Sequence, residues 1–193
     1  MSHGDEATRI AEARGRPRYA GRGLPARARP SSARGCGVLS GDAIAHDAAF
    51  VPYLDGDAVR RLTGHKHLPA IAQPCKATLY GNVRALHDAG VRLLAGTDAI
   101  LEGTAFGASL HGELALLVDA GLSPLEALRA ATSAPADQLG LADRGRIRTG
   151  ARGTVILVSG DPTTDITATR RIVGIWKNGV ALDRQAAASA IAR

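Results

Sequence analysis

Residues 90–99 read Gly-Val-Arg-Leu-Leu-Ala-Gly-Thr-Asp-Ala, and this stretch decides the fold prediction. The apolar run 91–96 predicts a short strand, after which the chain passes through Thr97 to Asp98. An aspartate just past the C-terminal end of a buried strand lies where α/β folds place their active residues. Such a carboxylate binds a metal, transfers a proton or accepts backbone hydrogen bonds, whereas an isolated Asp is more commonly a helix N-cap or turn residue. From the local pattern alone, the chemical and the structural interpretations of Asp98 are equally supported.

A helix is predicted directly before this strand. Leu79, Val83 and Leu86 are spaced four and three residues apart, which places them on one helical face, and Gly90 ends the helix. A helix followed by a strand of parallel type indicates an α/β fold.

Two further helices are predicted after Asp98. His111 opens the first of them, and Gly121 ends it. The second has a clear start signal, because Ser123 is placed as its N-cap and Glu126 completes a capping box. This second helix is expected to stop at Gly140.

Beyond residue 140 the pattern changes to short strands, which predict a small antiparallel β module. The predicted strands cover residues 146–148, 154–158, 171–176 and 180–182. Asn178-Gly179 lies between the last two strands and favours a type I′ hairpin turn. The Ala-rich residues 183–193 predict a short terminal helix.

The region before residue 79 has weaker patterns. An apolar run within residues 38–45 ends at His46 and predicts a buried strand. Residues 55–62 predict a short helix. In the ambiguous stretch 64–78, residues 68–72 are a candidate strand.

The excess positive charge lies in the first 37 residues. The chain has 193 residues and a formal charge of +6, and residues 1–37 hold eight Arg against three acidic residues. This segment is rich in Arg, Ala, Gly and Pro without an apolar period, so we expect a disordered tail. Nucleic-acid binding is the weaker interpretation, because Tyr19 is its only aromatic residue for base stacking.

The overall composition of the chain is that of a globular protein. No apolar run is long enough for a membrane span, and no secretory signal follows Met1. Cys36 and Cys75 have no metal-type spacing and are too few for a disulfide framework. We therefore expect a soluble, cytoplasmic protein.

The order of motifs resembles the amidohydrolase superfamily. The run 90–99 is similar to the last barrel strand of that family, and residues 111–132 continue the resemblance in the right order. The remaining matches are Gly140-Leu141, Gly145-Arg146-Ile147, Gly150, Gly160-Asp161-Pro162 and the hairpin 172–179. The most similar branch contains imidazolonepropionases and prolidase-like enzymes, which hydrolyse carbon–nitrogen bonds in cyclic amides, amides or dipeptides.

The resemblance implies a (β/α)₈ barrel with one or two divalent metals, usually zinc, which activate a water molecule for attack on a small-molecule substrate. Asp98 is similar to the family's final-strand aspartate, which is catalytic and a metal ligand. His46 is similar to a metal-binding histidine that ends the sixth strand, although a histidine with only a backbone hydrogen bond remains the alternative. His111 is similar to a histidine that orients the aspartate or meets substrate, and its alternative is a solvent-facing helix start. His65 and His67 have a family-like spacing but the wrong chain order, so they are interpreted as exposed loop histidines.

Chain length limits how much of such an enzyme is present. A complete barrel takes about 250 residues, so residues 38–140 accommodate the last three or so βα units, and residues 141–193 supply part of a small β-sandwich module with its terminal helix. The chain is thus expected to be a C-terminal part of a hydrolase, inactive alone or dependent on self-association or a complementing chain. The alternative is a non-catalytic remnant or interaction module that binds no metal.

Overall fold

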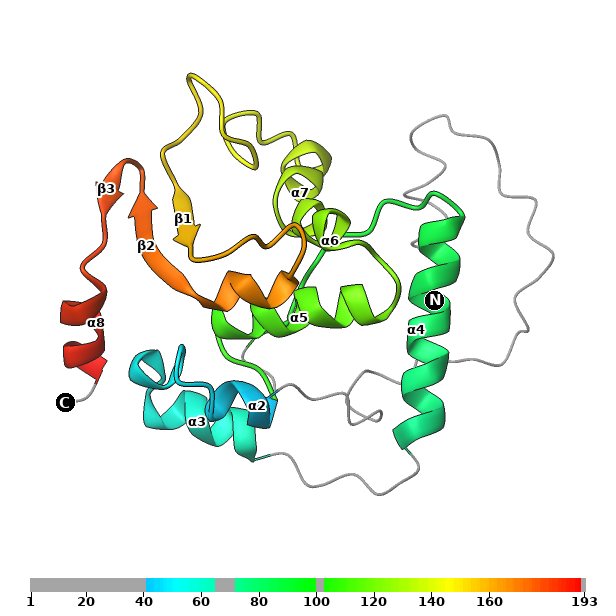
Figure 1. Cartoon of the computed structure of the whole chain (residues 1–193), viewed down its shortest axis with the longest axis horizontal. Helices are drawn as coiled ribbons and strands as arrows, with labels where there is room; N and C mark the ends of the chain where they lie inside the picture. The colour runs from blue at the N-terminus through cyan, green and yellow to red at the C-terminus, as the bar shows by residue number, and fades with distance from the viewer. Residues whose placement is uncertain (1–40, 65–71, 100–102, 192–193) are drawn as a thin grey trace. The chain divides into compact units, whose positions relative to one another are not determined.

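A computed structural model describes residues 41–64, 72–99 and 103–191, all of which belong to one structural unit (Figure 1). The elements in chain order are α2 (Gly41–Ala45), the 3₁₀ helix η2 (Val51–Tyr53), α3 (Gly56–Thr63), α4 (Ala72–Asp88), α5 (Ala108–Asp119), α6 (Pro124–Ala131), α7 (Ser133–Gln138), β1 (Val155–Val158), the 3₁₀ helix η3 (Ile166–Arg170), β2 (Ile172–Lys177), β3 (Val180–Ala181) and α8 (Arg184–Ile191). Helices and one antiparallel sheet therefore make up the described part.

The first core cluster joins α2 and α3 to the beginning of α5. Ile44 and Leu62 are completely buried in it, and Phe50 and Ala108 pack against them. Asp55 begins α3, because its carboxylate Oδ1 accepts a hydrogen bond from the backbone N–H of Ala58 at 2.6 Å. The predicted helix 55–62 is thus confirmed, and its buried face helps to fix the start of α5.

The second core cluster lies between α5 and α6. Leu114 and Leu117 of α5 pack with Ala127 and Ala130 of α6, and Leu122 is buried between the two helices. Gly121 allows this tight connection, because its backbone φ of 107° is one that residues with a side chain rarely adopt. The backbone N–H of Leu122 donates a hydrogen bond to the carbonyl of Leu117 at 3.1 Å, and this bond caps the C-terminal end of α5.

The predicted capping box at the start of α6 is present. Ser123 Oγ accepts a hydrogen bond from the N–H of Glu126, and the Glu126 carboxylate accepts one from the N–H of Ser123 at 2.8 Å. The hydrogen bonds from Ser123 and His87 lower the pKa of Glu126 to about 2, so this carboxylate stays ionised.

We expect Ser123→Ala to lower the free energy of unfolding by about 1 kcal/mol, because the backbone N–H of Glu126 at the start of α6 loses the Ser123 hydroxyl that accepts its hydrogen bond. Urea unfolding monitored by circular dichroism measures this change. Ser189→Ala is the matched control, since Ser189 is exposed within α8 and should change stability by less than about 0.5 kcal/mol. An equal effect of the two substitutions would contradict the capping role.

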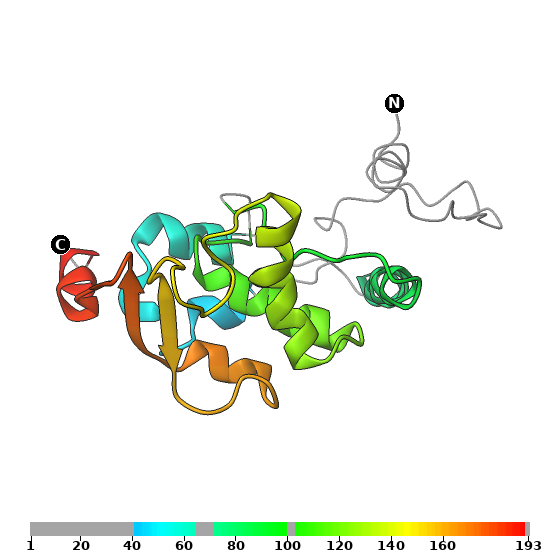
Figure 2. The same ribbon diagram turned by 90° about the horizontal axis from the view of Figure 1, so that it is seen from above.

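The sheet has the strand order β1-β2-β3, and both pairs are antiparallel. Figure 2 shows β1 and β2 running beside each other. The hairpin between β2 and β3 turns at Asn178 and Gly179, whose φ angles of 53° and 82° confirm the predicted turn with two left-handed residues. Several apolar side chains of this sheet remain exposed, including Ile156, Leu157 and Val173.

Three predicted strands are wrong. Residues 41–45 form the short helix α2, and a short apolar run does not distinguish a buried helix from a buried strand by periodicity. Residues 146–148 form no strand, because Arg146 turns back to Asp137 with two 2.7 Å hydrogen bonds and Ile147 is exposed. Residues 91–96 have no ladder partner among the described residues, so the parallel barrel strand expected there is absent from that part.

The other boundaries differ by smaller amounts. The helix predicted to open at His111 begins three residues earlier, at Ala108. The helix expected to reach Gly140 is divided at Thr132 into α6 and α7. The helices predicted before Gly90 and after residue 183 are confirmed as α4 and α8. The tail 1–37 and most of the candidate strand 68–72 lie outside the described residues.

None of the helices in the described ranges combines the length and apolar character that crossing a membrane requires.

Candidate active site

The segment 91–98 ends at Asp98 and has the alternating burial of a strand, but no strand among the described residues pairs with it. From Leu93 to Asp98, half-buried and exposed residues alternate, and Leu93 and Ala95 pack against the second core cluster. The N–H of Ala95 donates to the carbonyl of Ala130 in α6 at 2.9 Å. The strand predicted from the apolar run 91–96 is therefore not formed in the described part, and packing against helices holds the segment instead.

Asp98 ends this segment with an exposed side chain. Its backbone φ is 48°, a left-handed conformation that Asp and Asn tolerate better than most residues. The chain therefore turns at Asp98, and its side chain is exposed to solvent.

His111 lies in the first turns of α5 and is half-buried. Its ring centroid is 5.1 Å from that of Phe50, and its Nδ1 atom is buried without a hydrogen-bond partner among the described residues. Burial and the positive charge of Arg170 lower the pKa of His111, whereas Asp47 opposes them. The lowered pKa favours the neutral imidazole, and one of its ring nitrogens has no hydrogen-bond partner in the described part of the chain.

Asp47 and Arg170 connect distant parts of the chain beside His111. Arg170 Nη1 lies 3.3 Å from Asp47 Oδ2, and both side chains are about three-quarters buried. A partly buried ion pair is screened less than a surface pair, so it helps to fix η3 against the turn that follows α2. His46 is the residue next to Asp47, and its side chain is exposed at the end of α2.

Glu113 extends this arrangement from α5 toward the Asp98 segment. Burial raises the pKa of Glu113, and a hydrogen bond from the backbone N–H of Gly96 opposes that rise. Helix α5 thus carries two titratable groups in different surroundings: His111 lies near Asp47 and Arg170, and Glu113 is half-buried among neighbours that raise its pKa.

The three residues expected to form the site are only partly brought together. His46 directly follows α2, and His111 lies on α5, which contacts α2. The segment that leads to Asp98 packs through Leu93 and Ala95 against the second core cluster, which includes residues of α5. Within the described ranges, no group of three or more His, Cys, Asp or Glu side chains is placed to hold a metal ion. Asp98, His46 and His111 therefore do not make up a metal centre by themselves. His65 and His67 lie outside the described residues.

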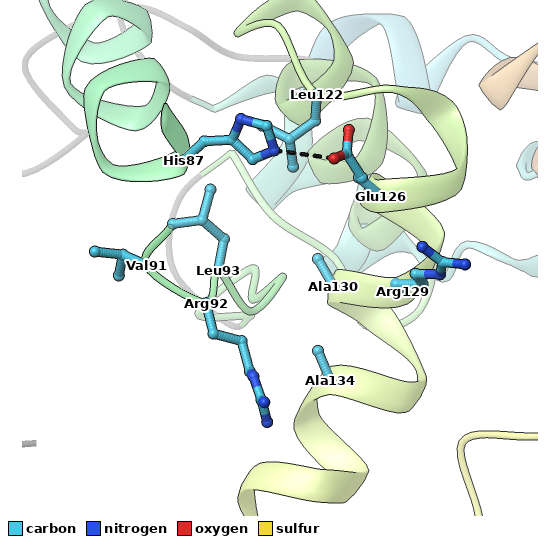
Figure 3. Close-up of a pocket in the computed structure, with 9 residues that line it drawn as sticks. All are labelled: His87, Val91, Arg92, Leu93, Leu122, Glu126, Arg129, Ala130 and Ala134. Atoms are coloured by element: carbon cyan, nitrogen blue, oxygen red, sulfur yellow. Dashed lines mark hydrogen bonds and ion pairs between the residues drawn. The ribbon is translucent and has the colours of Figure 1, made fainter. Parts of the chain in front are cut away.

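A cavity of about 180 Å³ lies at the opposite end of the segment (Figure 3). It is lined by His87, Val91, Arg92, Leu93, Leu122, Glu126, Arg129, Ala130 and Ala134. His87 Nε2 is 3.1 Å from the Glu126 carboxylate, which itself caps α6. Figure 3 shows the guanidinium groups of Arg92 and Arg129 pointing in different directions, so the cavity offers no convergent anion site. Asp98 is not among its lining residues.

We expect stability to fall as the pH drops below 6.5, the ordinary pKa of histidine, because the folded protein holds His111 neutral. The unfolded chain binds this proton first, and the loss of stability continues until the pH passes the lowered pKa of the folded state. Urea unfolding between pH 7.5 and 5 should therefore show a smaller pH dependence in His111→Gln than in the wild type. Identical slopes would contradict the neutral, buried imidazole.

Sequence reasoning missed Asp47 and Arg170. Asp47 and Arg170 are 123 residues apart, and no local pattern connects them.

The sequence comparison identifies the family. The profile of the amidohydrolase family matches residues 59–182. That match covers well over half of the chain and includes Asp98, His111 and the three strands. The chain belongs to the amidohydrolase family. No match was found among curated protein sequences.

Solved structures agree with this assignment. A bottromycin amidohydrolase is 25% identical with a TM-score of 0.54, and the match covers 82% of this chain and 38% of that one. Another amidohydrolase is 26% identical with a TM-score of 0.50, over 62% of this chain and 30% of that one. A Xaa-Pro dipeptidase with bound methionine in the active site, 23% identical with a TM-score of 0.50 over 75% and 32%, shows likeness of fold alone.

These matches relate the fold to the TIM barrel, and they also show how much of a matched structure this chain covers. The chain spans about a third of the length of the solved structures that it matches.

Proposed function

We propose that Asp98 belongs to an active site that hydrolyses a carbon–nitrogen bond of a small molecule. The substrate class is a cyclic amide, an amide or a dipeptide-like compound, and ordinary peptide bonds in proteins are excluded from the proposal. The observation that supports it most is an exposed carboxylate at the end of a core-packed segment, inside the region that matches the amidohydrolase family.

The chemistry assigned to Asp98 is proton transfer. An ionised carboxylate accepts the proton of an attacking water molecule and returns it to the leaving nitrogen, which would otherwise depart as an unstable amide anion. His111 lies on the adjoining helix with a neutral ring, so it is suited to donate a hydrogen bond to substrate or to orient Asp98. In this proposal His111 binds and orients, and Asp98 is the catalytic residue.

The family resemblance implies a divalent metal, zinc in the first place, which lowers the pKa of a bound water molecule. Asp98 and His46 are the residues proposed as ligands. The described residues do not fit a complete site, because they include no group of three suitable donors. Further donors have to come from residues outside the described ranges, from a second copy or from a complementing chain.

We further propose the domain organisation that the resemblance suggests. Residues 38–140 would contribute βα units to a barrel, residues 141–193 would contribute to a β module, and residues 1–37 would form a separate tail. The exposed apolar residues of the sheet support this division, since Ile156, Leu157 and Val173 are each more than half exposed. Side chains of this kind are normally covered by further protein surface. We also propose that the protein is located in the cytoplasm.

A direct test incubates the purified chain with zinc and a panel of cyclic amides, amides and dipeptides, and measures the released amine. Hydrolysis that disappears with a chelator is the expected result. Specific activity that rises with chain concentration would assign the missing donors to a second copy. Constant specific activity with one zinc per chain would assign them to the same chain.

The alternative function is a non-catalytic interaction module without metal. It is favoured by the same exposed apolar side chains of the sheet, which a partner could cover. If the assay detects no hydrolysis and no zinc binding, while a cooperative thermal transition shows that the chain is folded, the hydrolase proposal is overturned and this alternative is supported.

A further inference from the structure

The role proposed for His111 requires a fixed orientation of its ring, and the backbone alone does not provide one. Ala108 in the same turn of α5 is buried in the first core cluster, and the N–H of Ala105 donates to the buried Ser109 Oγ at 2.9 Å. These contacts hold the start of α5. The torsion that turns an imidazole about its Cβ–Cγ bond is broad, however, so a fixed backbone leaves the ring several directions.

The hydrogen bonding of His111 does not set this direction either. A hydrogen bond to one ring nitrogen of a histidine commonly determines what the other nitrogen can do. The Nδ1 atom of His111 is buried, and it has no hydrogen-bond partner in the described part of the chain. Within that part, the direction of the ring therefore depends on the side chains that pack against it.

Phe50 makes the aromatic contact with His111. The two ring centroids are 5.1 Å apart and the ring planes are tilted by 35°. Aromatic side chains attract each other at separations of about 4.5–7 Å. Phe50 is only 5% exposed and packs with Ile44 and Leu62 in the first core cluster. Because protein interiors are close-packed, the Phe50 ring cannot move aside without disturbing this core, and it restricts the directions open to the imidazole.

The turn that carries Phe50 is held by Asp47. The Phe50 N–H donates to the Asp47 carbonyl at 2.9 Å, and Asp47 Oδ1 accepts a hydrogen bond from the N–H of Ala49 at 2.9 Å. An aspartate that bonds the backbone two residues further on is a common way of fixing a turn. The second carboxylate oxygen, Oδ2, lies 3.3 Å from Arg170 Nη1 in a mostly buried ion pair. Arg170 thus ties this turn to the end of η3.

We propose that Phe50 is a positioning residue that sets the direction of the His111 imidazole, and that Asp47 and Arg170 hold Phe50 in place. The inference rests on the proposed role of His111 and adds three residues that act through it. Phe50 touches neither the substrate nor the reacting atoms in this account. Its function is to keep the His111 ring in the orientation that meets substrate or Asp98.

Phe50→Leu tests the proposal, because leucine keeps an apolar side chain in the core and removes the aromatic ring. In NMR relaxation measurements, the order parameter of the His111 ring C–H bonds should fall below about 0.6, while that of the His111 backbone N–H should stay at about 0.85. Phe106→Leu is the matched control, since it makes the same change at a side chain that is 71% exposed. It should leave both order parameters unchanged.

Arg170 offers a second pair of variants, which decides the matter if Phe50→Leu does not fold. Arg170→Ala removes the partner of Asp47 Oδ2, whereas Arg170→Lys keeps a positive charge near it. The nuclear Overhauser effects between the Phe50 and His111 rings should weaken in Arg170→Ala and return in Arg170→Lys. An ion pair that only adds stability would leave these effects at their wild-type strength in both variants.

Catalysis provides a further readout on a substrate found with the zinc-loaded chain. Phe50→Leu should lower kcat about 10-fold or more with a smaller effect on KM, since a misdirected group at the site affects the chemical step. Phe106→Leu should keep the wild-type kcat. A Phe50 that served the core alone would not produce this division between kcat and KM.

Three results would overturn the proposal. An unchanged ring order parameter in Phe50→Leu would show that His111 is oriented without Phe50, and an equal loss of order in ring and backbone would show general loosening of the fold. Unchanged ring contacts in Arg170→Ala would remove Asp47 and Arg170 from the account. These measurements are independent of turnover. If the wild type hydrolyses nothing, the proposed function fails, while the NMR results still decide whether Phe50 positions His111.

Discussion

Replacing Asp98 with Asn should lower kcat/KM for carbon–nitrogen bond hydrolysis by at least about 100-fold, because proton transfer by a positioned side chain contributes about 10²–10⁴-fold. Asparagine keeps the size of the side chain and loses its ability to accept a proton. It also tolerates the left-handed backbone at this position, where φ is 48°. The substitution therefore changes the chemistry with little backbone strain.

Stability and a second carboxylate serve as controls for this prediction. The free energy of unfolding should change by less than about 0.5 kcal/mol, since the Asp98 side chain is exposed. Asp88→Asn is the matched variant, because Asp88 is also exposed and its only ion-pair partners in the described part are Arg84 and His87 at the end of α4. Equal activity of wild type and Asp98→Asn would remove Asp98 from the mechanism.

Leu62→Ala should produce the largest loss of stability, about 2–5 kcal/mol. Leu62 is completely buried, and its removal leaves a cavity beside Ile44 and Phe50 in the first core cluster. Phe50 also contacts the ring of His111, so loosening this core should disturb the start of α5. Chemical denaturation at pH 7.5 measures the change in the free energy of unfolding.

The control for this substitution is Leu139→Ala. Leu139 follows α7 and its side chain is 68% exposed, so the same chemical change should cost less than about 0.5 kcal/mol. A small effect at Leu62 would contradict a packed core formed by α2, α3 and α5. An accompanying shift of the His111 ring resonances in Leu62→Ala would show that this core supports the site.

Local signals predicted the helices well. The Ser123–Glu126 capping box and the Asn178-Gly179 turn are decided by neighbouring residues, and both are present. Strands require partners that are distant in the sequence. The run 91–96 has the alternation of a strand but no partner within the described ranges, and residues 41–45 are too few for periodicity to separate strand from helix.

The candidate site was predictable to a similar extent. Asp98 and His111 came from the order of family motifs, and the profile match covers both residues. The environment of His111 could not be foreseen, because Asp47 and Arg170 meet only after α2, α5 and η3 have packed. The roles of Asp98 and His111 thus stay predictions from sequence patterns, and packing determined which groups surround His111.

A zinc titration observed at the carboxyl carbon of Asp98 tests the central claim most directly. With the carboxylates labelled with ¹³C, the Asp98 resonance should shift or broaden as zinc is added, while the exposed control Asp88 should remain unchanged. An Asp98 resonance that stays at its starting position at saturating zinc would contradict an active site built on this carboxylate.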